Sequence, residues 1–121
     1  MKQEPRHYEA LPEFQDAVPL YFVDEVDYWI FHEELLAHPE QGDVIPNTGG
    51  ARKIRYEDRR RGKGKRGGLR IIYFWFSNRL TVVTVDIYSK DEKADLSADD
   101  RERIKRIGRK IRDEWKERGE S

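Results

Sequence analysis

A glycine-rich basic segment is the part of the chain whose residue types point most directly to chemistry. It spans residues 62–68 (GKGKRGG) and carries Lys63, Lys65 and Arg66. Glycines let a backbone approach a ligand closely, while the lysine and arginine side chains supply charge for phosphate groups. The segment lacks the Lys-Ser/Thr pair and the following helix of a nucleotide-binding P-loop. We therefore predict contact with the backbone of a nucleic acid, and the alternative is a solvated connection between strands.

Further cations lie on the strands predicted around this segment. Lys53 and Arg55 alternate along one predicted strand and share a face, while Arg70 opens the next strand. If the two strands pair, these three cations converge on one surface and can stabilise the extra negative charge of a pentacoordinate phosphate. The alternative is that they only keep a surface strand soluble. The predicted catalytic residues are Lys53, Arg55, Arg70, Tyr88 and Lys90, and the predicted RNA-binding residues are Arg52, Lys63, Lys65, Arg66 and Tyr73.

Aromatic residues in the same region allow two interpretations. Tyr73, Trp75 and Tyr88 can stack on unpaired bases, which is how proteins commonly bind single-stranded RNA. The alternative is that they fill the core of the sheet, which we favour for Trp75. The three histidines show no metal-ligand spacing, so we predict no metal and no cofactor.

Charge is distributed unevenly although the net charge is zero. Residues 1–45 hold eleven acidic and two basic residues, whereas residues 52–70 hold ten basic and two acidic residues. The middle of the chain should attract phosphate and the first third should repel it, so we expect the acidic third to lie away from the basic surface.

Length and composition predict one cytoplasmic domain covering residues 1–121. The chain contains no cysteine, which excludes disulfides and thiolate metal sites. No apolar run resembles a signal peptide or approaches the roughly 20 residues of a membrane span, so we predict no membrane association.

The elements that must position these residues suggest an α+β fold. The pattern predicts N-terminal helices over about 12–17 and 25–37, the second capped by Asp24. The apolar residues of the second helix lie near helical spacing and are Val26, Trp29, Ile30, Leu36 and Ala37. Three strands over 52–56, 69–76 and 80–88 predict an antiparallel sheet core. A C-terminal helix begins after Ser97, which with Asp100 forms a capping box. Its predicted apolar stripe consists of Ile104, Ile107, Ile111 and Trp115.

Three stretches of the sequence together resemble the RelE/HigB toxin superfamily, in its HigB branch. They are residues 42–55 (GDVIPNTGGARKIR), 62–73 (GKGKRGGLRIIY) and 87–97 (IYSKDEKADLS), and they cover about half of the chain in the family's order. The resemblance implies a RelE-like fold of the microbial-RNase type and an endoribonuclease that cleaves mRNA in the ribosomal A site without a metal. The attacking group would be the 2′-hydroxyl of the substrate, and the partner would be a HigA-type helix-turn-helix antitoxin.

By the same resemblance, Lys53 and Arg55 match the basic pair of the first core strand, and Arg70 matches the arginine before Ile-Ile-Tyr. The arginine and tyrosine that complete the site in the RelE branch fall on Asp91 and Ser97, which cannot do the same work. This departure leaves the general acid and base open, with Lys90, Lys65 and Tyr88 as candidates. It also keeps two other readings open: a non-catalytic RNA-binding or ribosome-binding module, which includes a redesigned inactive relative, and a basic groove that mainly docks an acidic partner.

Overall fold

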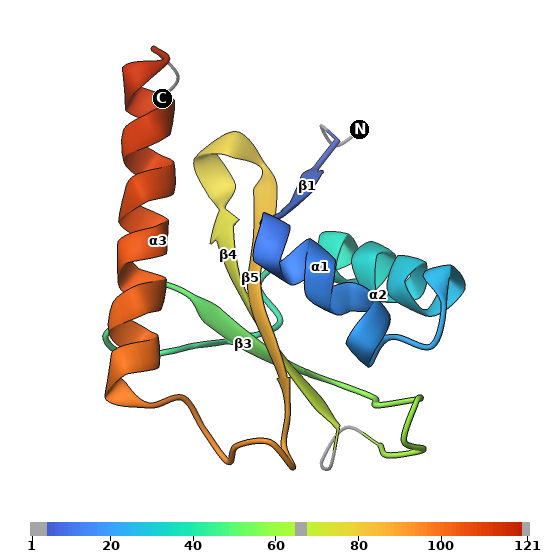
Figure 1. Ribbon diagram of the computed structural model, residues 1–121. Coiled ribbons are helices and arrows are strands. Elements are labelled where there is room, and N and C mark those ends of the chain that lie inside the picture. The colour runs from blue at the N-terminus through green and yellow to red at the C-terminus, as the bar shows by residue number, and fades with distance from the viewer. Residues whose placement is uncertain (1–4, 65–67, 120–121) are drawn as a thin grey trace.

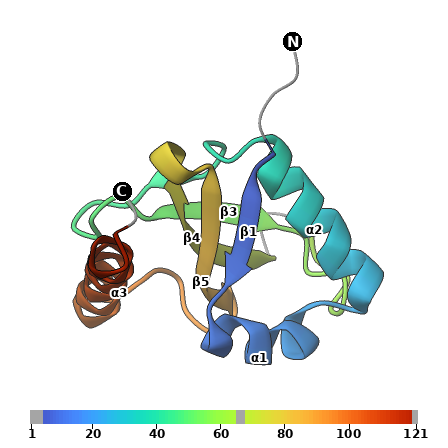
Figure 2. The ribbon, with the colours of Figure 1, turned by 90° about the horizontal axis from the view of Figure 1, so that it is seen from above.

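A computed structural model describes residues 5–64 and 68–119 and has an α+β architecture. One five-stranded sheet lies between α3 on one face and α1 and α2 on the other (Figures 1 and 2). The elements in chain order are β1 (His7–Ala10), α1 (Pro12–Tyr21), α2 (Glu25–Ala37), β2 (Asp43–Val44), β3 (Arg52–Tyr56), β4 (Leu69–Phe76), the 3₁₀ turn η1 (Ser77–Arg79), β5 (Thr81–Ser89) and α3 (Ala98–Glu117). Among the described residues, no helix is long and apolar enough to cross a membrane.

The sheet is larger than the three antiparallel strands expected from the sequence. Its order is β1-β5-β4-β3-β2, and β1 runs parallel to β5 while the other neighbours are antiparallel. The three predicted strands and the hairpin between β4 and β5 are confirmed. The two additional strands lie at the edges, and their lengths of four and two residues give little periodic signal.

The face under α1 and α2 holds an aromatic core. Phe14 of α1 and Phe31 and Leu35 of α2 pack against Ile71 and Tyr73 of β4. The sequence pattern of α2 suggested a different inward face, because Val26, Trp29 and Ile30 recur at helical spacing. Those three side chains are exposed in the structure, so the prediction was wrong for them, whereas Leu36 does pack against the core. Phe31, directly after Ile30, and Leu35, one turn further on, are the buried apolar residues of α2.

The ends of these two helices differ in how well the sequence predicted them. Asp24 caps α2 by accepting a hydrogen bond from the Asp27 amide, as expected. By contrast, α1 continues to Tyr21 and includes Pro19, which we expected to end the helix. Pro19 lies in the last turn of α1, and its side chain is exposed.

The opposite face of the sheet is covered by α3. Ile104 and Trp115 are buried against a cluster that includes Phe74 and Phe76, as the apolar stripe predicted. The capping box of Ser97 and Asp100 is also confirmed. Gly108 permits this close packing, since a Cβ there would lie 2.6 Å from Cζ of Phe74.

Candidate nucleic-acid interface

Three strands place Arg55, Arg70 and Tyr88 in one row across the sheet. Arg55 of β3 is the direct partner of Arg70 on β4, and Arg70 is the direct partner of Tyr88 on β5. Directly paired residues point to the same face, which is the face that α3 covers because Tyr88 belongs to the α3 core cluster. Lys53 lies two residues before Arg55 and shares its face. The pairing expected between these strands is therefore present, and it brings Lys53, Arg55, Arg70 and Tyr88 together.

The two arginines of the row differ in exposure. Arg55 is exposed, and within the described residues it forms no ion pair with a carboxylate. Arg70 is buried, and its Nη1 donates to the carbonyl oxygen of Leu69 at 3.2 Å. Burial lowers the pKa of the Arg70 guanidinium, and the charge of Arg55 lowers it further. Two neighbouring cations of this kind favour the binding of an anion.

Tyr88 lies beneath the surface at the end of the row. The ring is covered by the Lys93 ammonium, which lies 4.9 Å from the ring centroid. Its hydroxyl is buried and has no hydrogen-bond partner among the described residues. Burial raises the pKa of Tyr88 to about 12, and the nearby Asp95 carboxylate acts in the same direction. The hydroxyl is thus protonated at neutral pH and is available as a donor.

A polar groove runs beside the row. It is lined by Lys53 and Arg55 of β3, Asp43 of β2, and Asp95 and Arg101 from the region where α3 begins. Lys53 Nζ lies 3.2 Å from Asp95 Oδ1, and Arg101 Nη2 lies 3.4 Å from the other oxygen of that carboxylate. The backbone amide of Leu96 donates to Asp95 and is the largest cause of its lowered pKa.

The loop between β3 and β4 uses much of its positive charge within the protein. Arg59 Nη1 lies 2.9 Å from Oδ1 of Asp27, a buried carboxylate of α2. Lys63 forms an ion pair with Asp91, which also contacts Arg61. Lys63 therefore lies in the predicted loop, but its ammonium group is paired with the Asp91 carboxylate.

Two further residues of the predicted loop, Lys65 and Arg66, lie outside the described residues. Lys90 directly follows β5 and has an exposed side chain, while its amide donates to the carbonyl oxygen of Gly68 at 3.1 Å. Lys90 is therefore near the end of β4 that carries Arg70.

The predictions for Tyr73 and Arg52 need correction. These residues are paired across β3 and β4 and point to the opposite face from the row. Tyr73 has no exposed surface, and its hydroxyl donates to the Pro39 carbonyl and accepts from the Gly42 amide, so the ring cannot stack on a base. Arg52 Nη1 donates to the carbonyl oxygens of Glu40 and Gly42. Both side chains hold the chain that leads into β2.

Sequence reasoning missed the residues that surround the row from the C-terminal side. Asp91, Lys93 and Asp95 lie between β5 and α3, and Arg101 lies in the first turns of α3. No periodic signal marks a connection of this kind. The only indication was that Asp91 occupies a place where the RelE branch has an arginine.

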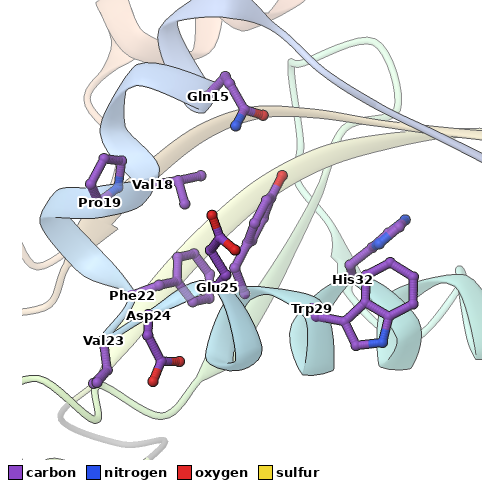
Figure 3. Close-up of a pocket in the computed structure, with 10 residues that line it drawn as sticks. Gln15, Val18, Pro19, Phe22, Val23, Asp24, Glu25, Trp29 and His32 are labelled. Carbon is purple, nitrogen blue, oxygen red and sulfur yellow. The ribbon is translucent and has the colours of Figure 1, made fainter.

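A second hollow lies between α1 and α2, on the far side of the sheet (Figure 3). Val18, Phe22 and Trp29 give it an apolar lining, and Asp24 and Glu25 lie at its edge. No lysine or arginine lines it, so this hollow does not suit phosphate.

Among the described residues, no group of three or more histidine or acidic side chains is arranged to hold a metal ion. No protein-family model matches the chain.

Proposed function

We propose that the protein is the toxin of a type II toxin–antitoxin system, a metal-independent endoribonuclease that cleaves mRNA in the ribosomal A site. The observation that carries this proposal is the row in which exposed Arg55 faces buried Arg70, with Tyr88 next to it. An exposed arginine without a carboxylate partner beside a second arginine favours an anionic ligand. The HigB branch, which residues 42–55, 62–73 and 87–97 resemble, indicates that this ligand is RNA.

The proposed reaction is an internal transesterification. The 2′-oxygen attacks the adjacent phosphorus, its proton passes to a base, and the bond to the 5′-oxygen breaks. The products are a 2′,3′-cyclic phosphate and a 5′-hydroxyl, so the leaving oxygen must gain a proton. Lys53 and Arg55 would stabilise the charge that develops on the phosphate oxygens.

Tyr88 fits the role of the proton donor. Because its pKa is raised to about 12, the hydroxyl carries its proton at neutral pH and cannot serve as the base. The hydroxyl is buried, so the side chains around it must move before a substrate can reach it. Lys90 is our candidate for the base, because it directly follows β5, the strand that carries Tyr88.

The proposal is tested by mRNA cleavage in a translating extract, with the cut ends mapped by primer extension. Cuts at A-site codons are expected, and Arg55→Ala should reduce them by about a hundredfold because it removes a charge that stabilises the transition state. Arg55 is exposed, so this variant should fold normally. Arg109→Ala removes an exposed arginine of α3 and serves as the matched control.

A second candidate is a non-catalytic module that binds RNA or the ribosome. The burial of both Arg70 and Tyr88 favours it, because buried groups reach a substrate less readily. Ribosome binding without any cuts would support this candidate and contradict the nuclease. For the nuclease, we further propose a cytoplasmic location and neutralisation by a HigA-type helix-turn-helix antitoxin.

A further inference from the structure

We infer that the connection between β5 and α3, residues 90–97, carries carboxylates that occupy two phosphate-binding subsites. One subsite consists of Arg61 and Lys63 and is occupied by Asp91. The other consists of Lys53 and Arg101 and is occupied by Asp95. This inference rests on the proposed function for the identity of the ligand, and it adds Arg61 and Arg101 to the residues that contact RNA.

The first subsite is built around one carboxylate oxygen. Asp91 Oδ2 accepts hydrogen bonds from Lys63 Nζ and, at 3.2 Å, from Arg61 Nη1. The same Arg61 nitrogen donates to Oγ of Ser89 at 3.2 Å. Lys63 is also the main cause of the lowered pKa of Asp91, so the carboxylate is ionised. An oxygen of a phosphodiester has the charge and acceptor capacity to take the place of this carboxylate oxygen.

The second subsite repeats the arrangement with different residues. Asp95 Oδ1 lies 3.2 Å from Lys53 Nζ, and Asp95 Oδ2 lies 3.4 Å from Arg101 Nη2. The two cations come from β3 and α3, and both line the polar groove beside Arg55. This subsite is therefore continuous with the row proposed to bind the scissile phosphate.

Exposure distinguishes these two carboxylates from those that serve the fold. The side chains of Asp91 and Asp95 are 51% and 52% exposed, whereas that of Asp27, the partner of Arg59, is only 4% exposed. Ion pairs at the surface are weak and are screened by salt, so an incoming phosphate can displace them. A buried carboxylate has no such access to solvent. Asp91 and Asp95 thus act as competitors for RNA within the chain.

The test measures the affinity of the full-length protein for a short single-stranded RNA in which every 2′-hydroxyl is methylated. Such an RNA cannot be cleaved by attack of its own 2′-oxygen, so binding is read by fluorescence anisotropy without turnover. Asp91→Asn and Asp95→Asn should each bind about fivefold more tightly than the wild type, because each substitution removes a competing carboxylate from two cations. Arg61 keeps its second carboxylate partner, the buried Asp58, whose Oδ2 lies 3.6 Å from Arg61 Nε. The dependence on salt should also become steeper.

Glu102→Gln is the matched control. It removes the same charge from an exposed position in the first turns of α3, and the described residues show no ion pair with Glu102. We expect its affinity to stay within about twofold of the wild type, since it changes only the distant electrostatic field. If Asp91→Asn and Asp95→Asn bind no more tightly than Glu102→Gln, the inference is overturned.

The double variant Asp91→Asn/Arg61→Ala identifies the cation responsible. It should lose the gain in affinity seen with Asp91→Asn, and an undiminished gain would overturn the first subsite. These measurements do not depend on cleavage. Tighter binding by the asparagine variants together with an absence of cuts in the extract would sustain the subsites and reject the nuclease, while the converse result would do the opposite.

Discussion

Tyr73 illustrates how a single residue near a cationic strand can be misassigned. Its neighbours in sequence include Arg70, and tyrosine is a common base-stacking residue in RNA-binding proteins. Alternation along β4 nevertheless turns Tyr73 away from Arg70. The hydroxyl satisfies the Gly42 amide and the Pro39 carbonyl, which would otherwise be buried without partners.

We predict that Tyr73→Phe lowers the free energy of unfolding by about 1–3 kcal/mol, because it leaves these two backbone groups without their partner. The affinity for RNA should remain that of the wild type. Urea denaturation and anisotropy measure the two quantities. A loss of RNA affinity at unchanged stability would show that Tyr73 contacts the ligand after all.

At the scale of single elements, the sequence predicted those whose side chains have a strong, regular pattern. The isoleucines of α3, its capping box and the β-branched strands β4 and β5 were all identified correctly. The pairing of Arg55 with Arg70 followed from two neighbouring strands. The edge strand β1 could not be predicted, because its four residues pair with a strand about 75 residues away and the pairing is a tertiary property.

The inward face of α2 was also beyond local pattern. Apolar residues occur on nearly every side of this helix, so periodicity does not select one face. Phe31 and Leu35 pack into the aromatic core under β4, whereas Trp29 is exposed. Competition between several apolar faces is decided by packing against the sheet.

The N-terminus of α3 gives an element-scale prediction about pH. The hydrogen bond from the Ser97 amide, together with Lys93, lowers the pKa of Asp100 from 3.8 to about 2. A carboxyl group whose pKa is lower in the folded state stabilises the fold above its unfolded pKa and loses this contribution as the pH falls through the folded pKa. The stabilisation by Asp100 should therefore be complete above about pH 5 and disappear between about pH 4 and pH 2.

Asp100→Asn should accordingly lose less stability than the wild type over that range of acid pH. At neutral pH we expect the variant to be less stable by about 1 kcal/mol, the usual contribution of a residue that caps a helix. Urea denaturation at a series of pH values measures both effects. If the free energy of unfolding changes with pH in the same way in both proteins, Asp100 does not link stability to pH.

At the scale of the whole molecule, the sheet separates the two charged regions only in part, because Arg59 and Arg60 of the basic loop contact Asp27 of α2 and Pro19 of α1. The acidic first third of the chain includes α1 and α2, which pack on one face, whereas Lys53 and Arg55 point to the other. Figure 2 shows α2 and α3 on opposite sides of the strands. The zero net charge of the chain thus conceals an uneven distribution, with Lys53 and Arg55 on the face opposite α1 and α2.

We predict that reversing Glu33 and Glu34 to lysine does not weaken binding to ribosomes. Both side chains are exposed on α2, away from the proposed interface. Sedimentation with ribosomes measures the bound fraction, and Arg55→Ala should reduce it under the same conditions. A clear loss of binding with the two lysines would place α2 at the ribosome and refute the separation described above.

The parallel pairing of β1 with β5 also imposes an order on the synthesis of this protein. Residues 7–10 are made before the strand on which they pair, which begins at Thr81. β5 also supplies Tyr88, so the cationic row cannot be assembled before β5 has been made. Contacts this distant in sequence form slowly, and the nascent chain must keep its first strand and helix unpaired until β5 is available. β5 must therefore leave the ribosome before the protein can form the surface that is proposed to act on ribosomes.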